Sequence, residues 1–165
     1  MTASRVAIVL GSDSDLEVFQ DAVKTLGEFG IPHEVRILSA HRSPNLVEKF
    51  VNEAEGRGIA VIIAGAGMAA HLAGVIASRT TLPVIGVPVA SGPLNGVDAL
   101  YSTVMMPPGI PVATMAVGKS GATNAAIFAA EILALSDARL KAALVKSRQD
   151  LESKIAGKDR KVRES

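Results

Sequence analysis

The sequence predicts an α/β protein, a three-layer α/β/α sandwich in which helices cover both faces of a parallel sheet. Two observations lead to this fold class. Short, wholly apolar runs alternate with segments whose apolar residues recur every three or four positions. Glycine-rich turns separate the two kinds of segment. Strands that alternate with helices pair in parallel and are joined by right-handed crossovers.

The first strand and helix are predicted at the start of the chain. The unbroken apolar run 6–10 is typical of a strand buried on both faces, and the turn Gly11 to Asp15 follows it. A strand, a glycine–serine turn and a helix start together direct backbone N–H groups at one point, which suits a phosphate. The acidic residues of the turn would repel an anion, and capping of the helix dipole explains them at least as well. Apolar residues at helical spacing define the helix: Leu16, Phe19, Val23 and Leu26.

A polar segment, Ser39 to Pro44, follows the second predicted strand, 35–38. It combines the imidazole of His41 with a fixed cation and two hydroxyls. Open α/β sheets bind ligands at the carboxyl ends of their strands, and an imidazole can transfer protons in both directions near neutrality. We interpret the segment as the reaction centre. The alternative is a structural turn in which Ser43 caps a helix and Pro44 takes its first position, and the segment alone does not favour either interpretation.

The middle of the chain repeats the pattern. A helix with apolar residues on one face between 46 and 54 precedes a third strand, 59–64. The segment after this strand is rich in small residues, including Gly67, that allow a close backbone approach. A second histidine, His71, stands where the next helix is expected to begin.

The last third of the chain completes the sandwich. We expect strands at 83–87 and 112–116, with a helix at 94–105 between them, and an alanine-rich helix at 121–135. An extra C-terminal helix carries apolar residues at helical spacing. We assign residues 1–156 to a single domain and expect the charged tail 157–165 to be disordered. The apolar residues of the extra helix are Leu140, Leu144, Leu151 and Ile155.

Composition excludes several classes of protein. Apolar residues make up 48% of the chain, yet no run approaches the roughly 18 to 20 residues of a membrane span. The 17 basic and 16 acidic residues nearly cancel, and one Tyr without Trp offers little to stack on bases, so nucleic-acid binding is not expected. Cysteine is absent and only three histidines are present, so we expect no disulfide and no metal. With no signal peptide in front of the first strand, a cytoplasmic protein is expected, and the apolar content favours a homo-oligomer.

The polar loops meet if the sheet has the flavodoxin-like strand order 2-1-3-4-5. The carboxyl ends of the first three strands are then neighbours, so loops 11–15, 39–44 and 65–71 converge. Arg42 supplies the cation that the acidic turn lacks, and Asp15 can accept a sugar hydroxyl beside a phosphate. The implied ligand is a phosphorylated sugar or nucleotide. His41 and His71 enter the same crevice, which favours acid/base chemistry over passive binding.

Four motifs carry a resemblance to a known family. From about residue 5 to 135, the chain closely resembles the class I N-carboxyaminoimidazole ribonucleotide mutases of bacterial purine biosynthesis. The resemblance implies a cofactor-free shift of a carboxylate from the exocyclic amine to a carbon of the imidazole ring, carried out by a homo-octamer. The motifs are GSDSD at 11–15, SAHRSP at 39–44, GAGMAAHL at 65–72 and the stretch 83–130, which begins PVIGVPVASGPLNG.

The resemblance also implies roles for single residues. The general acid/base falls on His41 and the second active-site histidine on His71. The chain departs from the family where Leu16 replaces Trp, Met68 replaces Gly and Ala73 replaces Pro. The substrate-binding residues are Ser12, Asp15 and Arg42, to which Ser39 and Gly67 of the same motifs are added.

Two alternatives share this scaffold. One is a class II aminoimidazole ribonucleotide carboxylase that uses carbon dioxide directly, but that class usually has Lys in place of Arg42 and lacks the Ala-Ala-His-Leu segment. The other is a non-catalytic nucleotide-binding protein, for which Met68 is the only argument.

A flavin carrier would need aromatic residues in the loops, and a receiver domain would need Asp in place of Gly65. A transient contact with the upstream ATP-dependent carboxylase is left open.

Overall fold

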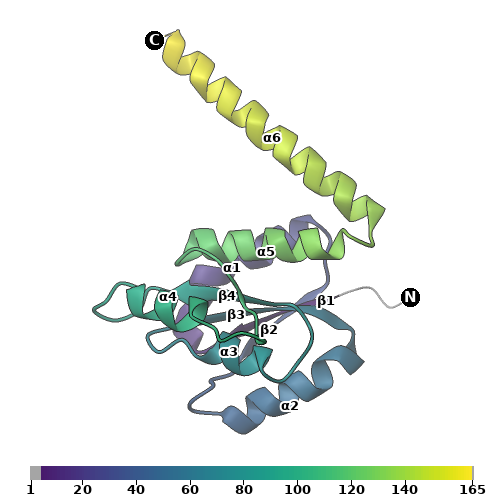
Figure 1. Cartoon of the computed structure of the whole chain (residues 1–165). Helices are drawn as coiled ribbons and strands as arrows, with labels where there is room; N and C mark the ends of the chain where they lie inside the picture. Colours follow the sequence, from purple (N-terminus) through teal and green to yellow (C-terminus); the bar gives the residue numbers. More distant parts are fainter. Residues whose placement is uncertain (1–4, 165) are drawn as a thin grey trace.

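A computed structural model describes residues 5–164 and shows a five-stranded, all-parallel sheet with the order β2-β1-β3-β4-β5 (Figure 1). This order is the predicted one, and so is the placement of helices on both faces of the sheet. The strands are β1 (Arg5–Leu10), β2 (His33–Ile37), β3 (Ile59–Gly67), β4 (Val84–Val89) and β5 (Ala113–Thr114). The last strand is shorter than the predicted range 112–116, because only two of its residues pair with β4.

The helices form two layers. Helices α1 (Leu16–Glu28) and α5 (Lys119–Leu133) pack together on one face of the sheet. Helices α2 (Pro44–Ala54), α3 (Leu72–Ala77) and α4 (Val97–Val104) lie on the other face. Two short 3₁₀ helices, η1 (Asp13–Asp15) and η2 (Glu55–Arg57), precede α1 and follow α2.

Strand β1 shows why the apolar runs are continuous. Val6, Ile8 and Leu10 belong to the core beneath α1 and α5, whereas Ala7 and Val9 belong to the core beneath α2 and α3. Because successive side chains of a strand point to opposite faces, a strand covered on both sides must be apolar at every position. Each fully buried Val, Leu or Ile contributes about 1.5 to 3 kcal/mol relative to exposure.

Helix α1 buries only part of its predicted apolar face. Phe19 and Leu26 are buried, but Leu16 in the first turn is 45% exposed. Leu46, in the first turn of α2, is exposed in the same way. Both residues lie beside the loops at the carboxyl ends of the strands, where the sheet no longer covers them.

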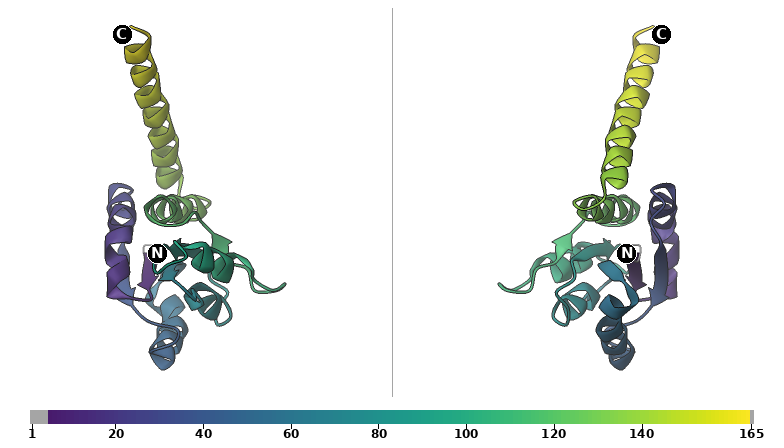
Figure 2. Two further views of the ribbon diagram at one scale, coloured as in Figure 1. Left: turned by 90° about the vertical axis from the view of Figure 1, so that its left-hand side faces the viewer. Right: turned by 90° about the vertical axis from the view of Figure 1, so that its right-hand side faces the viewer.

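The C-terminal segment corrects the expected disordered tail. Helix α6 (Ala138–Arg163) continues without a break through the range 157–163. Lys and Arg are good helix formers, the last turn is basic and therefore complements the helix dipole, and Asp159 pairs with Arg163 at 3.8 Å. Figures 1 and 2 show that α6 leaves the body of the molecule and extends away from it. No helix within residues 5–164 is long and apolar enough to cross a membrane.

Candidate active site

The three predicted loops line one crevice at the carboxyl edge of the sheet. Its volume is about 450 Å³. The β1–η1, β2–α2 and β3–α3 loops all contribute, as does the loop after β4. All seven predicted site residues lie in its lining: Ser12, Asp15, Ser39, His41, Arg42, Gly67 and His71. A larger hollow of about 1010 Å³ opens near the amino end of β4 and contains none of these residues.

The turn after β1 is a compact network of hydroxyl and carboxyl groups. Ser12 Oγ accepts hydrogen bonds from the Ser14 amide at 3.4 Å and from the Ser14 hydroxyl at 2.9 Å, and it donates to Asp13 Oδ1 at 3.1 Å. Asp15 is only 5% exposed. Burial raises the pKa of Asp15, while hydrogen bonds from Ser12 and Ser14 and the nearby charge of Arg42 act in the opposite direction.

Arg42 ties the loop after β2 to the turn after β1. Its Nη2 donates to the carbonyl oxygen of Gly11 at 2.8 Å, and its backbone N–H donates to Ser39 Oγ at 3.1 Å. Ser43 occupies the N-cap position of α2, as predicted, with Pro44 at the first turn. Its side chain does not cap the helix, however. It bonds instead to the backbone N–H and carbonyl of Ser39, at 2.9 and 3.1 Å, and so closes the loop that carries Arg42.

His41 and His71 are joined by a hydrogen bond between their rings. His41 Nε2 and His71 Nδ1 are 2.8 Å apart, and the ring planes are inclined at 74°. One of these nitrogen atoms must donate the hydrogen bond and the other must accept it, so the tautomers of the two rings are coupled. Both side chains are solvent-accessible. A pair of this kind can hold a proton at the crevice and transfer it to or from a ligand.

At the end of β3, Gly67 allows the close approach of a neighbouring segment that was predicted for the glycine-rich loop. A Cβ atom on Gly67 would overlap the hydroxyl of Ser91, which follows the carboxyl end of β4. Met68 lines the crevice with a φ of 53°, a left-handed conformation that a side chain disfavours.

Among the hydroxyl-bearing residues of the lining, sequence reasoning missed Ser14 and Ser91. The available signal for Ser91 was its position just after a buried strand, at the same sheet edge as the other loops. The third histidine, His33, begins β2 at the opposite end of the sheet, as expected, and its Nδ1 lies 2.9 Å from the carbonyl oxygen of Ile31. Within residues 5–164, no group of three or more His, Cys, Asp or Glu side chains is arranged to hold a metal ion.

Comparison with known proteins gives one consistent result. The family model for AIR carboxylase matches residues 5–154. A protein of Pyrococcus horikoshii is 50% identical over 159 residues, which cover 96% of this chain and 89% of that protein. A protein of Escherichia coli (strain K12) is 55% identical over 137 residues, which cover 83% of this chain and 81% of that protein. Both are called N5-carboxyaminoimidazole ribonucleotide mutase. The crystal structure of Treponema denticola PurE superposes with a TM-score of 0.87 at 30% identity, covering 96% of this chain and 98% of that one.

Proposed function

Because this chain belongs to the AIR carboxylase family, we propose that it is an N5-carboxyaminoimidazole ribonucleotide mutase, an isomerase of purine biosynthesis. The reaction moves the carboxyl group from the exocyclic nitrogen of the substrate to a carbon of its imidazole ring. The observation that carries the proposal is the hydrogen-bonded pair of His41 and His71 in the same crevice as Arg42. Such a crevice combines a group that transfers protons with a cation for a phosphate.

The substrate's phosphate is assigned to Ser12 and Arg42. The bond from Arg42 to Gly11 holds the guanidinium against the turn that carries Ser12, so a phosphate can accept from Arg42 and from Ser12, whose hydroxyl turns from Asp13 to the ligand. Ser39 fixes the backbone of Arg42, and the buried carboxyl of Asp15 accepts a ribose hydroxyl. Gly67 is assigned to the substrate through its backbone, since the hydroxyl of Ser91 fills the space that a side chain at this position would need.

The chemistry needs two proton transfers. The bond between the exocyclic nitrogen and the carboxyl carbon breaks, carbon dioxide is released, and the nitrogen keeps the electron pair and takes a proton. The ring carbon then attacks the carbon dioxide and loses its own proton, which restores the aromatic ring. We assign both transfers to His41 and give His71 the role of orienting it through their shared hydrogen bond. Arg42 cannot exchange a proton at neutral pH.

A direct assay tests the proposed activity. Purified protein is incubated with N5-carboxyaminoimidazole ribonucleotide and, in a second reaction, with aminoimidazole ribonucleotide and bicarbonate. We expect the 4-carboxylated product from the first reaction, without ATP or any added cofactor, at a rate far above the second. Efficient product formation only from aminoimidazole ribonucleotide would instead identify a class II carboxylase. If neither reaction gave product, the alternative of a non-catalytic nucleotide-binding protein would be favoured.

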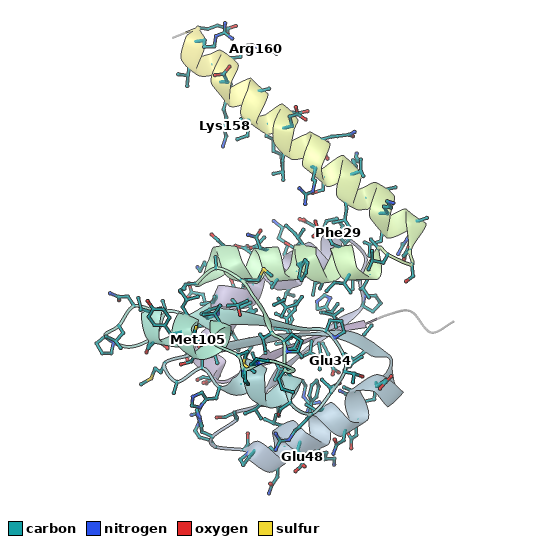
Figure 3. All side chains as sticks on the ribbon, in the orientation of Figure 1. Phe29, Glu34, Glu48, Met105, Lys158 and Arg160 are labelled. Carbon is teal, nitrogen blue, oxygen red and sulfur yellow. The ribbon has the colours of Figure 1, made fainter. Side chains whose placement is uncertain are left out.

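We also propose that the enzyme is a homo-oligomer, with the octamer implied by the family resemblance as the first choice. One supporting feature is a row of apolar side chains on α4 and its flanking residues, each between 46% and 77% exposed: Leu94, Val97, Tyr101, Val104 and Met105. In Figure 3, the label of Met105 lies beside α4, and those of Lys158 and Arg160 lie on the extended part of α6. Exposed apolar patches of this kind are typical of protein–protein interfaces.

Other assignments remain predictions. We place all catalytic and substrate-binding residues in the single domain assigned to 1–156. A cytoplasmic location is consistent with a chain that has no cysteine. A transient contact with the ATP-dependent carboxylase that makes the substrate would shorten the path of an unstable intermediate.

A further inference from the structure

Ser91 stands out among the hydroxyl groups of the crevice. The hydroxyls of Ser12, Ser14 and Ser39 are all engaged in hydrogen bonds within the loops that carry them. Ser91 is half-buried and lines the same crevice. Across the part of the chain that the structure describes, residues 5–164, its hydroxyl has no hydrogen-bond partner. The Ser91 hydroxyl is therefore free to bond to a ligand.

The position of Ser91 fits one end of the substrate. Arg42 contacts Gly11 at the end of β1, whereas Ser91 follows β4, two strands further along the sheet. Neighbouring strands are about 4.8 Å apart, so the ends of β1 and β4 are separated by about 10 Å along the edge of the sheet. If the phosphate lies at Arg42, the ribose and the imidazole ring extend toward Ser91. The end of the substrate farthest from the phosphate is the carboxyl group.

The surroundings hold the hydroxyl in place. Ser91 Oγ occupies the space that a Cβ of Gly67 would need, so it lies directly against the backbone at the end of β3. The next residue, Gly92, adopts a φ of 77°, and a Cβ atom added to it would come within van der Waals range of the Met68 side chain. Ser91 is thus packed against the end of β3, and it already lines the crevice that a ligand would enter.

We infer that Ser91 is a further substrate-binding residue, whose hydroxyl donates a hydrogen bond to the carboxylate that the reaction transfers. The inference rests on the proposed function and adds a contact that neither the family resemblance nor the relatives' names assign. A hydrogen bond to a carboxylate is stronger than one to a neutral group. Ser91 therefore binds the carboxylated substrate and product in preference to the decarboxylated ribonucleotide.

A comparison of two ligands tests this contact. The dissociation constants of the 4-carboxylated product and of aminoimidazole ribonucleotide, which lacks the carboxyl group, are measured by calorimetry for wild type and Ser91→Ala. We expect Ser91→Ala to weaken binding of the carboxylated ligand by about 10-fold or more and to leave the other ligand unchanged. Arg42→Ala should weaken both ligands to a similar degree, because both carry the phosphate.

Ser102→Ala is the matched control. The Ser102 hydroxyl is half-buried and donates to the Asp98 carbonyl within α4, outside the crevice, so neither affinity should change. Unchanged binding of the carboxylated ligand by Ser91→Ala would overturn the inference, and so would an equal loss for both ligands, since that would indicate a structural role. Wild-type protein that bound neither ligand would contradict the proposed function itself.

Discussion

A hydrogen bond joins His41 Nε2 and His71 Nδ1, the two histidines of the crevice. At 2.8 Å the two rings compete for one bridging proton, so a change in one imidazole alters the tautomer of the other. In the proposed mechanism, one ring exchanges the proton with the substrate while the other holds the first in position.

The first prediction concerns the division of roles between the histidines. His41→Asn is close to neutral in size and should still bind substrate, but it should lose at least about 100-fold in kcat, because the general acid/base is missing. His71→Asn should be milder, since it removes only the orienting hydrogen bond. Steady-state kinetics with N5-carboxyaminoimidazole ribonucleotide measure kcat and KM separately. Near-normal turnover by His41→Asn would refute the mechanism, whereas loss of binding would make His41 a recognition residue.

The second prediction follows from the raised pKa of Asp15. Because of burial, the pKa of the Asp15 carboxyl is higher in the folded protein than the value of about 3.8 in the unfolded chain. At neutral pH the carboxyl is ionised, and its charge in a buried position destabilises the fold. Asp15→Asn should therefore raise the melting temperature at pH 7 in the absence of ligand. The difference from wild type should shrink as the pH falls through the folded pKa and vanish below 3.8. A variant that is less stable than wild type at pH 7 would mean that the hydrogen bonds to the carboxylate outweigh its burial.

The third prediction concerns the backbone at Met68. Its φ of 53° costs a residue with a side chain about 1 kcal/mol relative to glycine, so Met68→Gly should be more stable than wild type by about that amount. Asn95→Gly is the matched control, because Asn95 has a φ of 51° but is a residue type that tolerates this conformation better and should gain less. Thermal or urea unfolding measures both changes. Destabilisation by Met68→Gly would show that the packing of the Met68 side chain outweighs the backbone strain.

At the scale of elements, helix α6 has two different halves. Leu140 and Leu144 are buried against the body of the molecule, while Leu151 and Ile155 on the same helix are 56% and 64% exposed. Spacings of four and seven residues place these four side chains along one face. Within residues 5–164, the face that packs against the chain's own domain thus continues beyond it, where Leu151 and Ile155 are more than half exposed. This is the geometry expected of a helix that packs against another subunit.

The fourth prediction tests this part of α6. The double variant Leu151→Glu with Ile155→Glu should lower the mass of the oligomer measured by light scattering, because two carboxylates cannot be buried in an apolar interface. The fold of the domain should be retained, since neither residue is buried within it. Gln149→Glu, on the opposite face of the helix, adds a negative charge without touching the stripe and should leave the mass unchanged. An unchanged mass for the double variant would remove α6 from the interface.

At the scale of the whole molecule, the strand order β2-β1-β3-β4 brings four loops to one edge of the sheet. Ser12, His41, His71 and Ser91 are far apart in the chain, yet all four line one crevice. The opposite edge carries the amino ends of the strands and none of these groups. The arrangement follows from parallel pairing, which places every carboxyl end on the same side.

The fifth prediction concerns the number of subunits in the intact enzyme. The exposed apolar rows on α4 and α6 should be covered by other copies, so light scattering at micromolar concentration should give a mass close to eight chains. A smaller closed oligomer would correct the subunit number taken from the family resemblance. A stable monomer would contradict the homo-oligomer altogether.

The sequence by itself determined the strand order of the sheet and seven of the residues that line the crevice. Apolar runs such as 6–10 predict buried strands because period-two alternation disappears when both faces are covered. Since polar loops follow the ends of these strands, parallel pairing is enough to predict that Ser12, Arg42 and His71 meet. The range 157–163 was misjudged because its charges resemble those of a disordered tail, although Lys and Arg also favour a helix.

Only the tertiary structure decided the contacts within the crevice. The bond between His41 and His71, the bond from Arg42 to Gly11 and the position of Ser91 against Gly67 depend on how far each loop reaches across its neighbours. The exposure of Leu151 depends in the same way on where α6 leaves the body of the molecule. The spacing of apolar residues in the sequence indicates whether a segment is a helix or a strand. The contacts named here join residues that are distant in the chain, and the spacing within one element does not specify the distance or direction between two elements.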